Sequence, residues 1–402
     1  MRSGLAVLSL GSTRALWEGA GSDDYARLSQ YARRLGSYRM VTTSYKRHRL
    51  SAIRLAPCWE CVPTDAYTPV DGWVRMVWIG ARWLRRQRVD VVQAQDPFYC
   101  GLAALVLGWW FRVPVNLCVY GPNGFDPHWV GSHWTHRILG WVGRAVLRRS
   151  DFVQVDGVLT LRRLAEGGIE PWRVFLKPVV PCDLGRFLEL GLERVAGGVV
   201  RLLFVGRLVG QKNLPLLLDA LVRMRGRGLP AFELVLAGSG PEEGALRRAV
   251  ENLGLGEQVR FRGAVERSEI AACFGGADVL VLSSDFEGYA RVLMEGAAAG
   301  LPIVCTQVSG AEEAVEDGVS GFVVPVGDAH GLADALSRLV GCGVLRERMG
   351  RAARGRVQGV LDPGGNAEAQ LRVWRRIAEG GVDGAGGRGC VVGDGEREEV
   401  GG

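Results

Sequence analysis

Short apolar runs, many of them β-branched, alternate with amphipathic segments along the second half of the chain. The segments between them, such as 213–226 and 244–254, repeat apolar positions at helical spacing. Continuous apolar strands separated by helices are typical of a parallel sheet covered on both faces, so the pattern predicts a doubly wound α/β domain. The predicted strands are 200–206, 232–238, 259–265, 277–284, 302–306 and 321–327.

The first half shows the same alternation with less regular runs. A first helix is expected at 22–36, and two α/β domains therefore lie in tandem. The predicted strands here are 4–11, 38–45, 89–96, 113–121 and 151–157.

These patterns give a first set of domain boundaries. We place one domain at 1–190, a linker across 188–200 and the second domain at 198–363. A last amphipathic helix, 364–379, is expected to pack back on the first domain. The tail 380–402 is mostly glycine and charge, and is predicted to be disordered.

Charge is distributed unevenly along the 402 residues. The net charge is +6, but residues 1–195 carry 26 Lys and Arg against 16 Asp and Glu. A basic half favours an anionic partner, whether a nucleic acid, a membrane surface or a phosphorylated substrate. No apolar run reaches the roughly 18 residues of a membrane span. A cytosolic protein with reduced thiols is expected.

Two cysteines have the spacing of half a zinc site or of a redox motif. They are Cys58 and Cys61 in "CWEC". Because no second cysteine or histidine pair accompanies them, we expect no metal or redox role.

Two glutamates, each followed by glycine, stand eight residues apart in "EGYARVLMEG". In one continuous helix Glu287 and Glu295 would lie about 80° apart and would not converge. They could converge if Glu287 lay in the loop after strand 277–284 and a helix began near 288–291. Carboxylates placed in this way can accept hydrogen bonds from sugar hydroxyls. The alternative is two exposed acids near a helix start, where acids are favoured in any case.

A pair of cations follows the first strand of the second domain. In "FVGRLVGQKN" Arg207 comes directly after the strand and Lys212 opens the next helix. Such a pair can bind a diphosphate, since Arg offers a planar fork and Lys a point charge. The chain has only three lysines among its 49 basic residues, and one of them stands here.

Taken together, these motifs resemble one family. "GRLVGQKN", "LVLAGSGPEEGALR", "VRFRGAV", "EGYARVLMEGAAAGLPIV" and "SGAEEAVEDGVSGFVVP" follow one another as in the carboxyl-terminal domain of retaining GT-B glycosyltransferases of the GT4 type. The match covers about 200–330. It implies an α/β fold of the GT-B kind, with two Rossmann-like domains and a nucleotide-sugar donor bound mainly by the second.

The resemblance assigns roles to individual residues. Arg207 and Lys212 are implied to stabilise the departing diphosphate, Glu295 to bind the ribose and Glu287 to contact the donor sugar. The implied donor-binding set is Gly206, Gly11, Gly288, Tyr289, Ala290, Arg291, Glu295 and Glu313.

Two positions depart from the family pattern. Gly296 stands where the family usually has alanine after the second glutamate. Tyr120 stands in "VYG" where many members have a histidine near the transferred sugar, and the nearest histidine is His128. We place Tyr120 in the catalytic set, as a hydrogen-bonding substitute.

The implied reaction is transfer of a sugar to a hydroxyl acceptor with retention and without a metal or cofactor. Cell-surface polysaccharide or glycolipid synthesis would suit it. The basic segment 73–90 carries Trp and Arg at helical spacing, so it either lies on an anionic membrane or packs on the first sheet with a solvated basic face. A nucleic-acid partner is not favoured, because no recognisable module is present.

Three other functions stay open. "GSGPEEG" follows a strand as in nicotinamide dehydrogenases, although its third glycine is one residue late. A sugar-nucleotide epimerase or a phosphorylase could share the fold. A protein that binds a nucleotide sugar without transferring it would explain the missing histidine.

Overall fold

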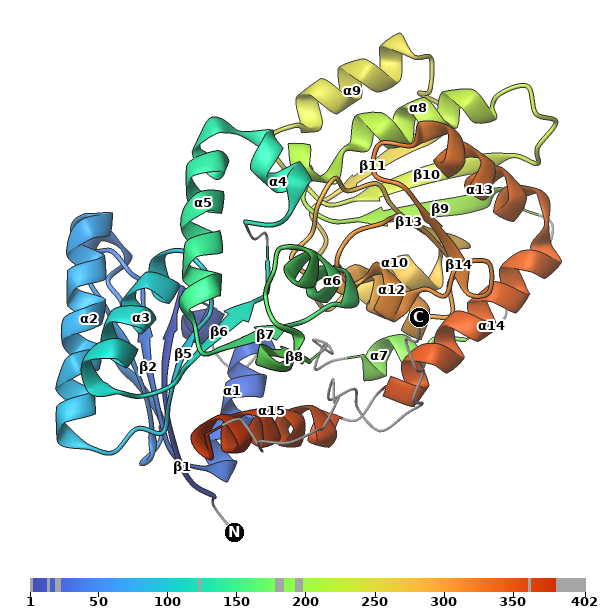
Figure 1. Cartoon of the computed structure of the whole chain (residues 1–402). Helices are drawn as coiled ribbons and strands as arrows, with labels where there is room; N and C mark the ends of the chain where they lie inside the picture. Colours follow the sequence, from blue (N-terminus) through green and yellow to red (C-terminus); the bar gives the residue numbers. More distant parts are fainter. Residues whose placement is uncertain are drawn as a thin grey trace. The chain divides into compact units, whose positions relative to one another are not determined.

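The chain folds into two compact units in a computed structural model that describes residues 3–12, 15–18, 23–121, 124–177, 184–191, 198–360 and 363–380 (Figure 1). The first unit comprises Met1–Asp156, Thr160–Pro178 and Asp362–Gly402. The second comprises Gly157–Leu159 and Val179–Leu361. Part of the predicted linker, 192–197, and the predicted disordered tail beyond Gly380 lie outside the described residues.

The first unit is built on an eight-stranded sheet in the order β3-β4-β2-β1-β5-β6-β7-β8, in which only the β3–β4 pair is antiparallel. The order reverses between β1 and β5. The strands are β1 (Ser3–Gly11), β2 (Leu35–Thr42), β3 (Ile53–Ala56), β4 (Trp59–Pro63), β5 (Val91–Ala94), β6 (Val115–Val119), β7 (Phe152–Val155) and β8 (Val174–Leu176).

Two separate cores cover the two faces of this sheet. Successive side chains of a strand point to opposite faces, and on β1 Val7 belongs to one core while Leu8 belongs to the other. Helices α2, α3 and α5 cover the face that Leu8 points to, and α1 and α15 cover the other. The helices are α1 (Asp23–Arg34), α2 (Pro69–Arg86), α3 (Tyr99–Phe111), α4 (Pro127–Ser132), α5 (Trp134–Arg149), α6 (Val158–Glu166) and α15 (Pro363–Ala378), with short 3₁₀ turns η1 (Ala15–Glu18), η2 (Lys46–His48) and η3 (Pro171–Arg173).

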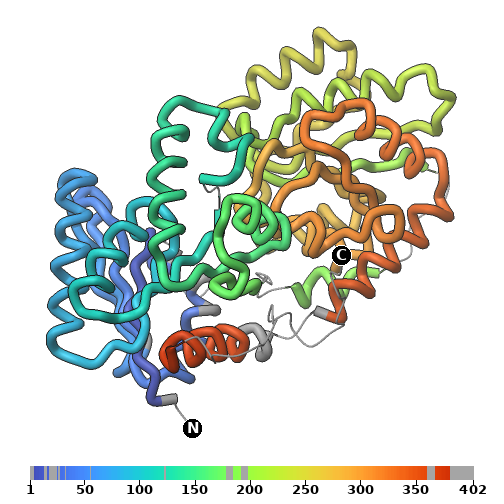
Figure 2. Tube along the Cα trace, in the orientation of Figure 1, coloured from blue at the N-terminus to red at the C-terminus, as the bar shows by residue number. Residues whose placement is uncertain are grey.

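Helix α15 joins the first unit although it comes last in the chain. Figure 2 shows it, in red, beside the blue amino-terminal segment. Trp374 is fully buried there and meets the ring of Tyr31 edge to face, with ring centroids 5.3 Å apart.

The second unit is a six-stranded parallel sheet in the order β11-β10-β9-β12-β13-β14. This is the Rossmann order, which reverses between the first and fourth strands. The strands are β9 (Val200–Val205), β10 (Phe232–Ala237), β11 (Val259–Gly263), β12 (Val279–Leu282), β13 (Ile303–Thr306) and β14 (Gly321–Val324). Every one lies within the run that predicts it.

Helices surround this second sheet and bury a single, mostly aliphatic core against it. No helix in the described ranges combines the length and the apolar composition that crossing a bilayer requires. The helices are α7 (Gly185–Leu188), α8 (Leu214–Met224), α9 (Glu243–Asn252), α10 (Ile270–Gly275), α11 (Arg291–Ala298), α12 (Ala311–Ala314), α13 (Ala329–Gly341) and α14 (Gly343–Val360), with the 3₁₀ turn η4 (Gly210–Lys212).

Candidate functional site

The second unit brings Lys212 and Glu287 together at the carboxyl ends of β9 and β12. These two strands pair with each other, but the chain leaves them toward opposite edges of the sheet. Open α/β sheets bind ligands at such a switch point. The loops 206–213 and 283–290 follow the two strands and form the candidate site.

Lys212 and Glu287 form an ion pair between these loops. Nζ of Lys212 lies 2.5 Å from Oε1 of Glu287, and the two side chains are 14% and 8% exposed. A partly buried pair is screened by salt far less than a surface pair. The predicted phosphate-binding lysine is therefore already in contact with the glutamate predicted to touch the sugar.

Further donors fix the Glu287 carboxylate. The Ser284 hydroxyl donates to Oε1 at 2.6 Å, and the Gln211 amide donates to Oε2 at 3.4 Å and to the carbonyl of Phe286 at 2.9 Å. Ser284 and Gln211 are not among the site residues predicted from the sequence. Their only signal was position, since Gln211 precedes Lys212 and Ser284 ends the predicted strand 277–284.

Other hydrogen bonds tie the two loops together. Asn213 donates to Oδ1 of Asp285 at 2.6 Å, and Ser283 donates to the Lys212 carbonyl at 2.9 Å. Asn213 has a positive φ of 42° and caps α8 by accepting from the Leu216 amide. Asparagine tolerates this backbone region better than most residues. The same residue therefore ends the 210–212 turn, starts α8 and holds the second loop.

Arg207 lies on the first loop with an exposed side chain. Main-chain hydrogen bonds fix the loop on both sides of it, from Gly206 to Ala237 and from Leu208 to Ser239. The structure thus places an exposed cation on the loop that also carries the paired Lys212.

The first two glycines of "GSGPEEG" are explained by close packing of backbone. A Cβ on Gly238 would lie 1.9 Å from the Gly206 carbonyl oxygen, and one on Gly240 would lie 2.2 Å from that of Leu208. These glycines let the loop after β10 rest on the loop after β9. That packing accounts for Gly238 and Gly240 without a dinucleotide.

A third loop, after β13, supports the loop before α11. Gly310 has φ +91°, and a Cβ there would lie 2.8 Å from the Ala290 nitrogen. The Ala290 amide donates to the Ser309 carbonyl, and the Arg291 amide donates to that of Tyr289. Two of the four backbone amides of 288–291 are therefore already hydrogen-bonded within the second unit.

Helix α11 begins at Arg291, so Glu287 lies in a loop and Glu295 on the second turn of the helix. Glu295 is half-buried. The next residue, Gly296, is buried against β12, and a Cβ added to it would lie 2.4 Å from Cδ2 of Leu280. The side chain of Leu280 occupies the space that the methyl group of an alanine at position 296 would need.

Glu313 is held by main chain at the start of α6. Its Oε1 accepts a hydrogen bond of 2.5 Å from the amide of Val158, which groups with the second unit. Burial raises the pKa of the Glu313 carboxyl above its usual value, and the bond from Val158 opposes that shift only in part.

In the first unit, Gly11 ends β1 at that sheet's own switch point. It is buried, and a Cβ there would lie 2.3 Å from Oε1 of Gln95, the residue after β5. Gln95 in turn donates to the Ser9 hydroxyl at 3.4 Å. Gly11 is thus needed to let Gln95 lie across the strand end.

Tyr120 follows β6 and is joined to a buried network of amides. Its hydroxyl accepts from Gln154 at 2.7 Å, and Gln154 forms a reciprocal pair of hydrogen bonds with Gln370 of α15, at 3.0 and 2.9 Å. Gln93 on β5 accepts from the Trp374 indole at 2.6 Å. The last helix of the unit therefore orients Tyr120 through Gln154.

His128 does not take the position of the family's histidine at the end of β6. It lies on α4, exposed, with its amide bonded to Asp126.

Cys58 and Cys61 do not form a paired site. Cys61 is a buried residue of β4, and burial raises its pKa to about 12. Cys58 lies in the turn before that strand, and no disulfide joins the two cysteines. Groups of three or more potential metal ligands are absent from the residues that the structure describes.

Fold and site together define a two-unit α/β protein with a charged candidate site at the switch point of the second sheet. The family model "Glycosyl transferases group 1" matches residues 194–356, and the model "Glycosyl transferase 4-like domain" matches 24–179. Together they span most of the chain, which is a glycosyltransferase and belongs to the group 1 family of the GT4 type.

Individual proteins agree with this assignment. The chain is 28% identical to glycogen synthase of Mycobacterium tuberculosis over 303 residues, covering 74% of this chain and 71% of the synthase. It is 32% identical to the putative colanic acid biosynthesis glycosyltransferase WcaL of Salmonella typhimurium over 212 residues, covering 51% and 50%. The structure of Anabaena HepE in complex with UDP matches with a TM-score of 0.66 at 15% identity, over 93% of this chain and all of HepE. The predicted GT-B fold is confirmed.

Proposed function

We propose that this glycosyltransferase moves a sugar from a nucleoside-diphosphate sugar to a hydroxyl acceptor with retention of anomeric configuration. The observation that carries the proposal is the Lys212–Glu287 pair at the β9–β12 switch point, with Arg207 exposed on the same loop. Two cations and an oriented carboxylate suit a ligand with a diphosphate at one end and sugar hydroxyls at the other.

In the proposed reaction the bond from the anomeric carbon to the diphosphate oxygen breaks as positive charge develops on the sugar. Arg207 and Lys212 stabilise the negative charge on the departing diphosphate. Lys212 is pre-positioned for this by its contact with Glu287, so its side chain need not be ordered when donor binds.

Glu287 is better suited to hold the sugar than to attack it. Lys212, Ser284 and Gln211 all donate to its carboxylate, and each such bond lowers the reactivity of the lone pairs. We therefore propose that the acceptor hydroxyl attacks from the side on which the diphosphate leaves, with no covalent intermediate on the protein. Glu295 would bind the donor's ribose, and no metal ion or cofactor is assigned a role.

The acceptor class is inferred from related proteins. Glycogen synthase and WcaL are named for the synthesis of polysaccharides, and HepE was crystallised with UDP. We propose a cytoplasmic enzyme of cell-surface polysaccharide or glycolipid synthesis that works at the inner face of the membrane on a sugar or lipid-linked acceptor.

A screen of nucleotide sugars tests the proposal. Wild type and Glu295→Ala would be compared for thermal shift and for slow release of nucleoside diphosphate by hydrolysis. We expect one donor to stabilise and be hydrolysed by wild type, with both effects lost in the variant. Stabilisation without release, even with sugar and lipid acceptors added, would instead favour a protein that binds the donor without transferring it. Interconversion of the free donor would indicate an epimerase.

A further inference from the structure

Most of the exposed tryptophans in the described residues gather on one layer of helices. All twelve tryptophans of the sequence lie in the segments of the first unit. Five of them are more than half exposed on α2, α3 and α5, namely Trp78 (61%), Trp109 (85%), Trp110 (58%), Trp134 (66%) and Trp141 (68%). A concentration of exposed large apolar side chains marks an interaction surface.

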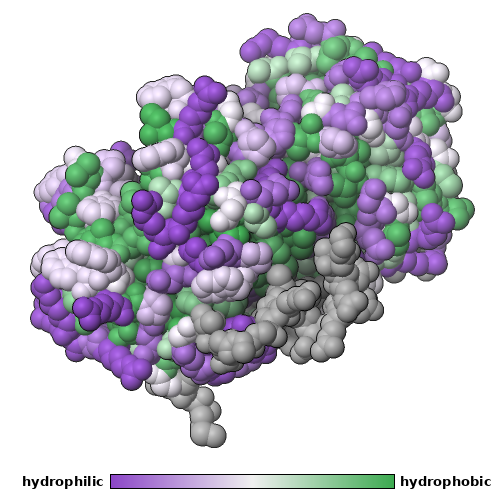
Figure 3. All heavy atoms as spheres, viewed as in Figure 1, coloured by the Kyte–Doolittle hydropathy of each residue, from purple (hydrophilic) through white to green (hydrophobic). Residues whose placement is uncertain are grey.

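The same three helices are strongly basic. They contain eight arginines and a single acid, Asp71, whose carboxylate is already bonded to Arg75 at 2.8 Å. The exposed arginines of α2 stand among the apolar side chains, since Val74, Trp78 and Arg82 follow one another at four-residue spacing on its outer side. In Figure 3 purple side chains lie between green and pale ones over the first unit.

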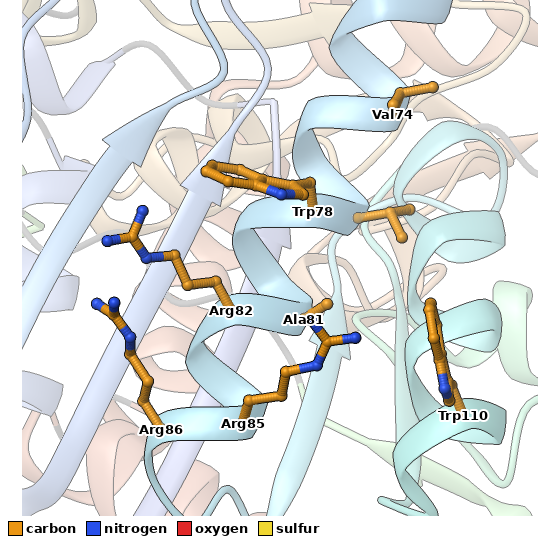
Figure 4. Close-up of a pocket in the computed structure, with 8 residues that line it drawn as sticks. Val74, Trp78, Ala81, Arg82, Arg85, Arg86 and Trp110 are labelled. Carbon is orange, nitrogen blue, oxygen red and sulfur yellow. The ribbon is translucent and has the colours of Figure 1, made fainter.

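Arginine and tryptophan meet directly between α2 and α3. The Arg82 guanidinium lies 5.6 Å from the Trp78 ring centroid, and that of Arg85 lies 5.6 Å from the ring centroid of Trp110 on α3. Figure 4 shows these residues around a hollow between the helices, with Arg82 and Arg86 projecting to one side of α2 and Arg85 directed toward Trp110. We call Trp78, Trp109, Trp110, Arg82, Arg85 and Arg86 the tryptophan–arginine face.

We propose that the tryptophan–arginine face docks on a bilayer that contains anionic phospholipid. Indole rings favour the headgroup level of a membrane, where one end is apolar and the other wet. Guanidinium groups pair with lipid phosphates, and each basic residue near an anionic surface strengthens binding. Helix α2, with 18 residues, would lie in the plane of the interface.

Charge and shape favour lipid over the other macromolecules. Tryptophan and arginine are also enriched at protein–protein interfaces, but eight arginines against one acid on these helices favour an anionic surface over a second copy of the same face. A single-stranded nucleic acid needs a groove that tracks its backbone between stacking rings, but this face includes exposed aliphatic residues on helices, such as Val74 (54%). The tryptophan–arginine face is not part of the proposed donor site, and membrane docking does not depend on sugar transfer. A lipid-linked acceptor would lie at the same membrane surface.

Vesicle co-sedimentation tests the proposal directly. Full-length protein would be mixed with vesicles of phosphatidylcholine alone and with vesicles that also contain phosphatidylglycerol. We expect binding only to the anionic vesicles, weakened by salt. Arg82→Gln/Arg85→Gln/Arg86→Gln is expected to weaken binding on the order of a hundredfold, from about fivefold per arginine. Trp78→Ser/Trp109→Ser should also weaken it.

Matched controls keep the result specific. Arg247→Gln/Arg248→Gln/Arg348→Gln removes three exposed arginines from the second unit, and Trp172→Ser removes an exposed tryptophan that lies outside the three helices. Both should bind as wild type does. Equal binding by all variants, equal binding to neutral vesicles, or no vesicle binding by wild type would overturn the proposal. So would self-association or oligonucleotide binding through this face without vesicle binding. Vesicle binding needs no donor, so it can succeed or fail independently of transfer.

Discussion

In the proposed reaction, Lys212 is the residue on which the chemistry of the second unit depends most. Its ammonium group is partly buried and bonded to Glu287, in a chain that otherwise uses arginine almost throughout. An ammonium is a compact charge that can be shared between a carboxylate and a phosphate, whereas a guanidinium would need a wider, planar site.

Replacing Lys212 by alanine is expected to slow transfer. Removing one charge-assisted contact costs about 1.5–3 kcal/mol, which corresponds to a loss of kcat on the order of tenfold to a hundredfold. Steady-state kinetics would measure it, with Lys46→Ala as the matched control because that lysine is exposed in the first unit. Because the change also removes the ion-pair partner of Glu287, thermal unfolding should be measured together with the rates. Unchanged kinetics would remove Lys212 from the site.

Glu313 should make the stability of the second unit depend on pH. Burial raises its folded-state pKa above the unfolded value, so the neutral acid is favoured by folding. The contribution of the neutral Glu313 carboxyl to the free energy of unfolding is complete at pH values below its unfolded-state pKa. It is lost as the pH rises through the folded-state pKa. We expect Glu313→Gln, which keeps an acceptor for Val158, to unfold at higher urea concentration than wild type at neutral pH. The difference should shrink toward pH 4.5, the carboxyl's ordinary pKa. A constant difference across that range would contradict this assignment.

Among the elements, α11 and β12 show how closely helix and sheet must fit at the site. The helix carries Glu295, and the strand leads into the loop that carries Glu287. Gly296 allows the helix to lie directly against Leu280. Gly296, which stands where the family usually has alanine, therefore faces a large residue, Leu280, on the neighbouring strand.

The fit predicts coupling between the two positions. Gly296→Ala gains about 1 kcal/mol of helix propensity, but overpacking against Leu280 costs about 1–3 kcal/mol, so we expect a net loss of stability. In a Leu280→Val background the same change should cost less. Urea unfolding of the four proteins would measure the coupling free energy. Additive effects would show that Leu280 does not restrict the helix.

Helix α15 completes the first unit through polar contacts as well as apolar ones. Gln93, Asn116 and Gln154 are buried on three adjacent strands, and Gln370 and Trp374 supply partners to the outer two. Gln370→Leu would leave the Gln154 amide without this pair, at a cost of about 1–3 kcal/mol. Thermal unfolding should show the loss, while Arg372→Gln, exposed on the same helix, should not. Equal stability of both variants would contradict the role of the amide pair.

Much of this architecture could be predicted from the sequence. All six strands of the second sheet lie within predicted apolar runs, and the loop position of Glu287 followed from the strand before it. Strands β3, β4 and β8 were missed, because runs of three to five residues next to turns carry little periodic signal. Gln211, Ser284 and the Gln93–Asn116–Gln154 row were also missed. Their importance comes from partners that are distant in sequence, and a local pattern does not reveal such partners.

At the scale of the whole molecule, charge and tryptophan content divide between the two units. The first carries every tryptophan and the basic helices, and the second carries all of the residues implied to bind the donor except Gly11. This division suits an enzyme whose acceptor and donor differ in nature. The proposed donor site can be tested most directly, because the Lys212–Glu287 contact there is defined.

The most direct test compares how nucleoside diphosphate and nucleoside bind to wild type and to Lys212→Ala. Calorimetric titration would use the base identified by the donor screen. If Lys212 binds the diphosphate, wild type should prefer the diphosphate strongly, and the variant should lose on the order of tenfold to a hundredfold of that preference while binding the nucleoside unchanged. An equal preference in both proteins would mean that the β9–β12 switch point does not bind the diphosphate through Lys212, and would contradict the proposed site.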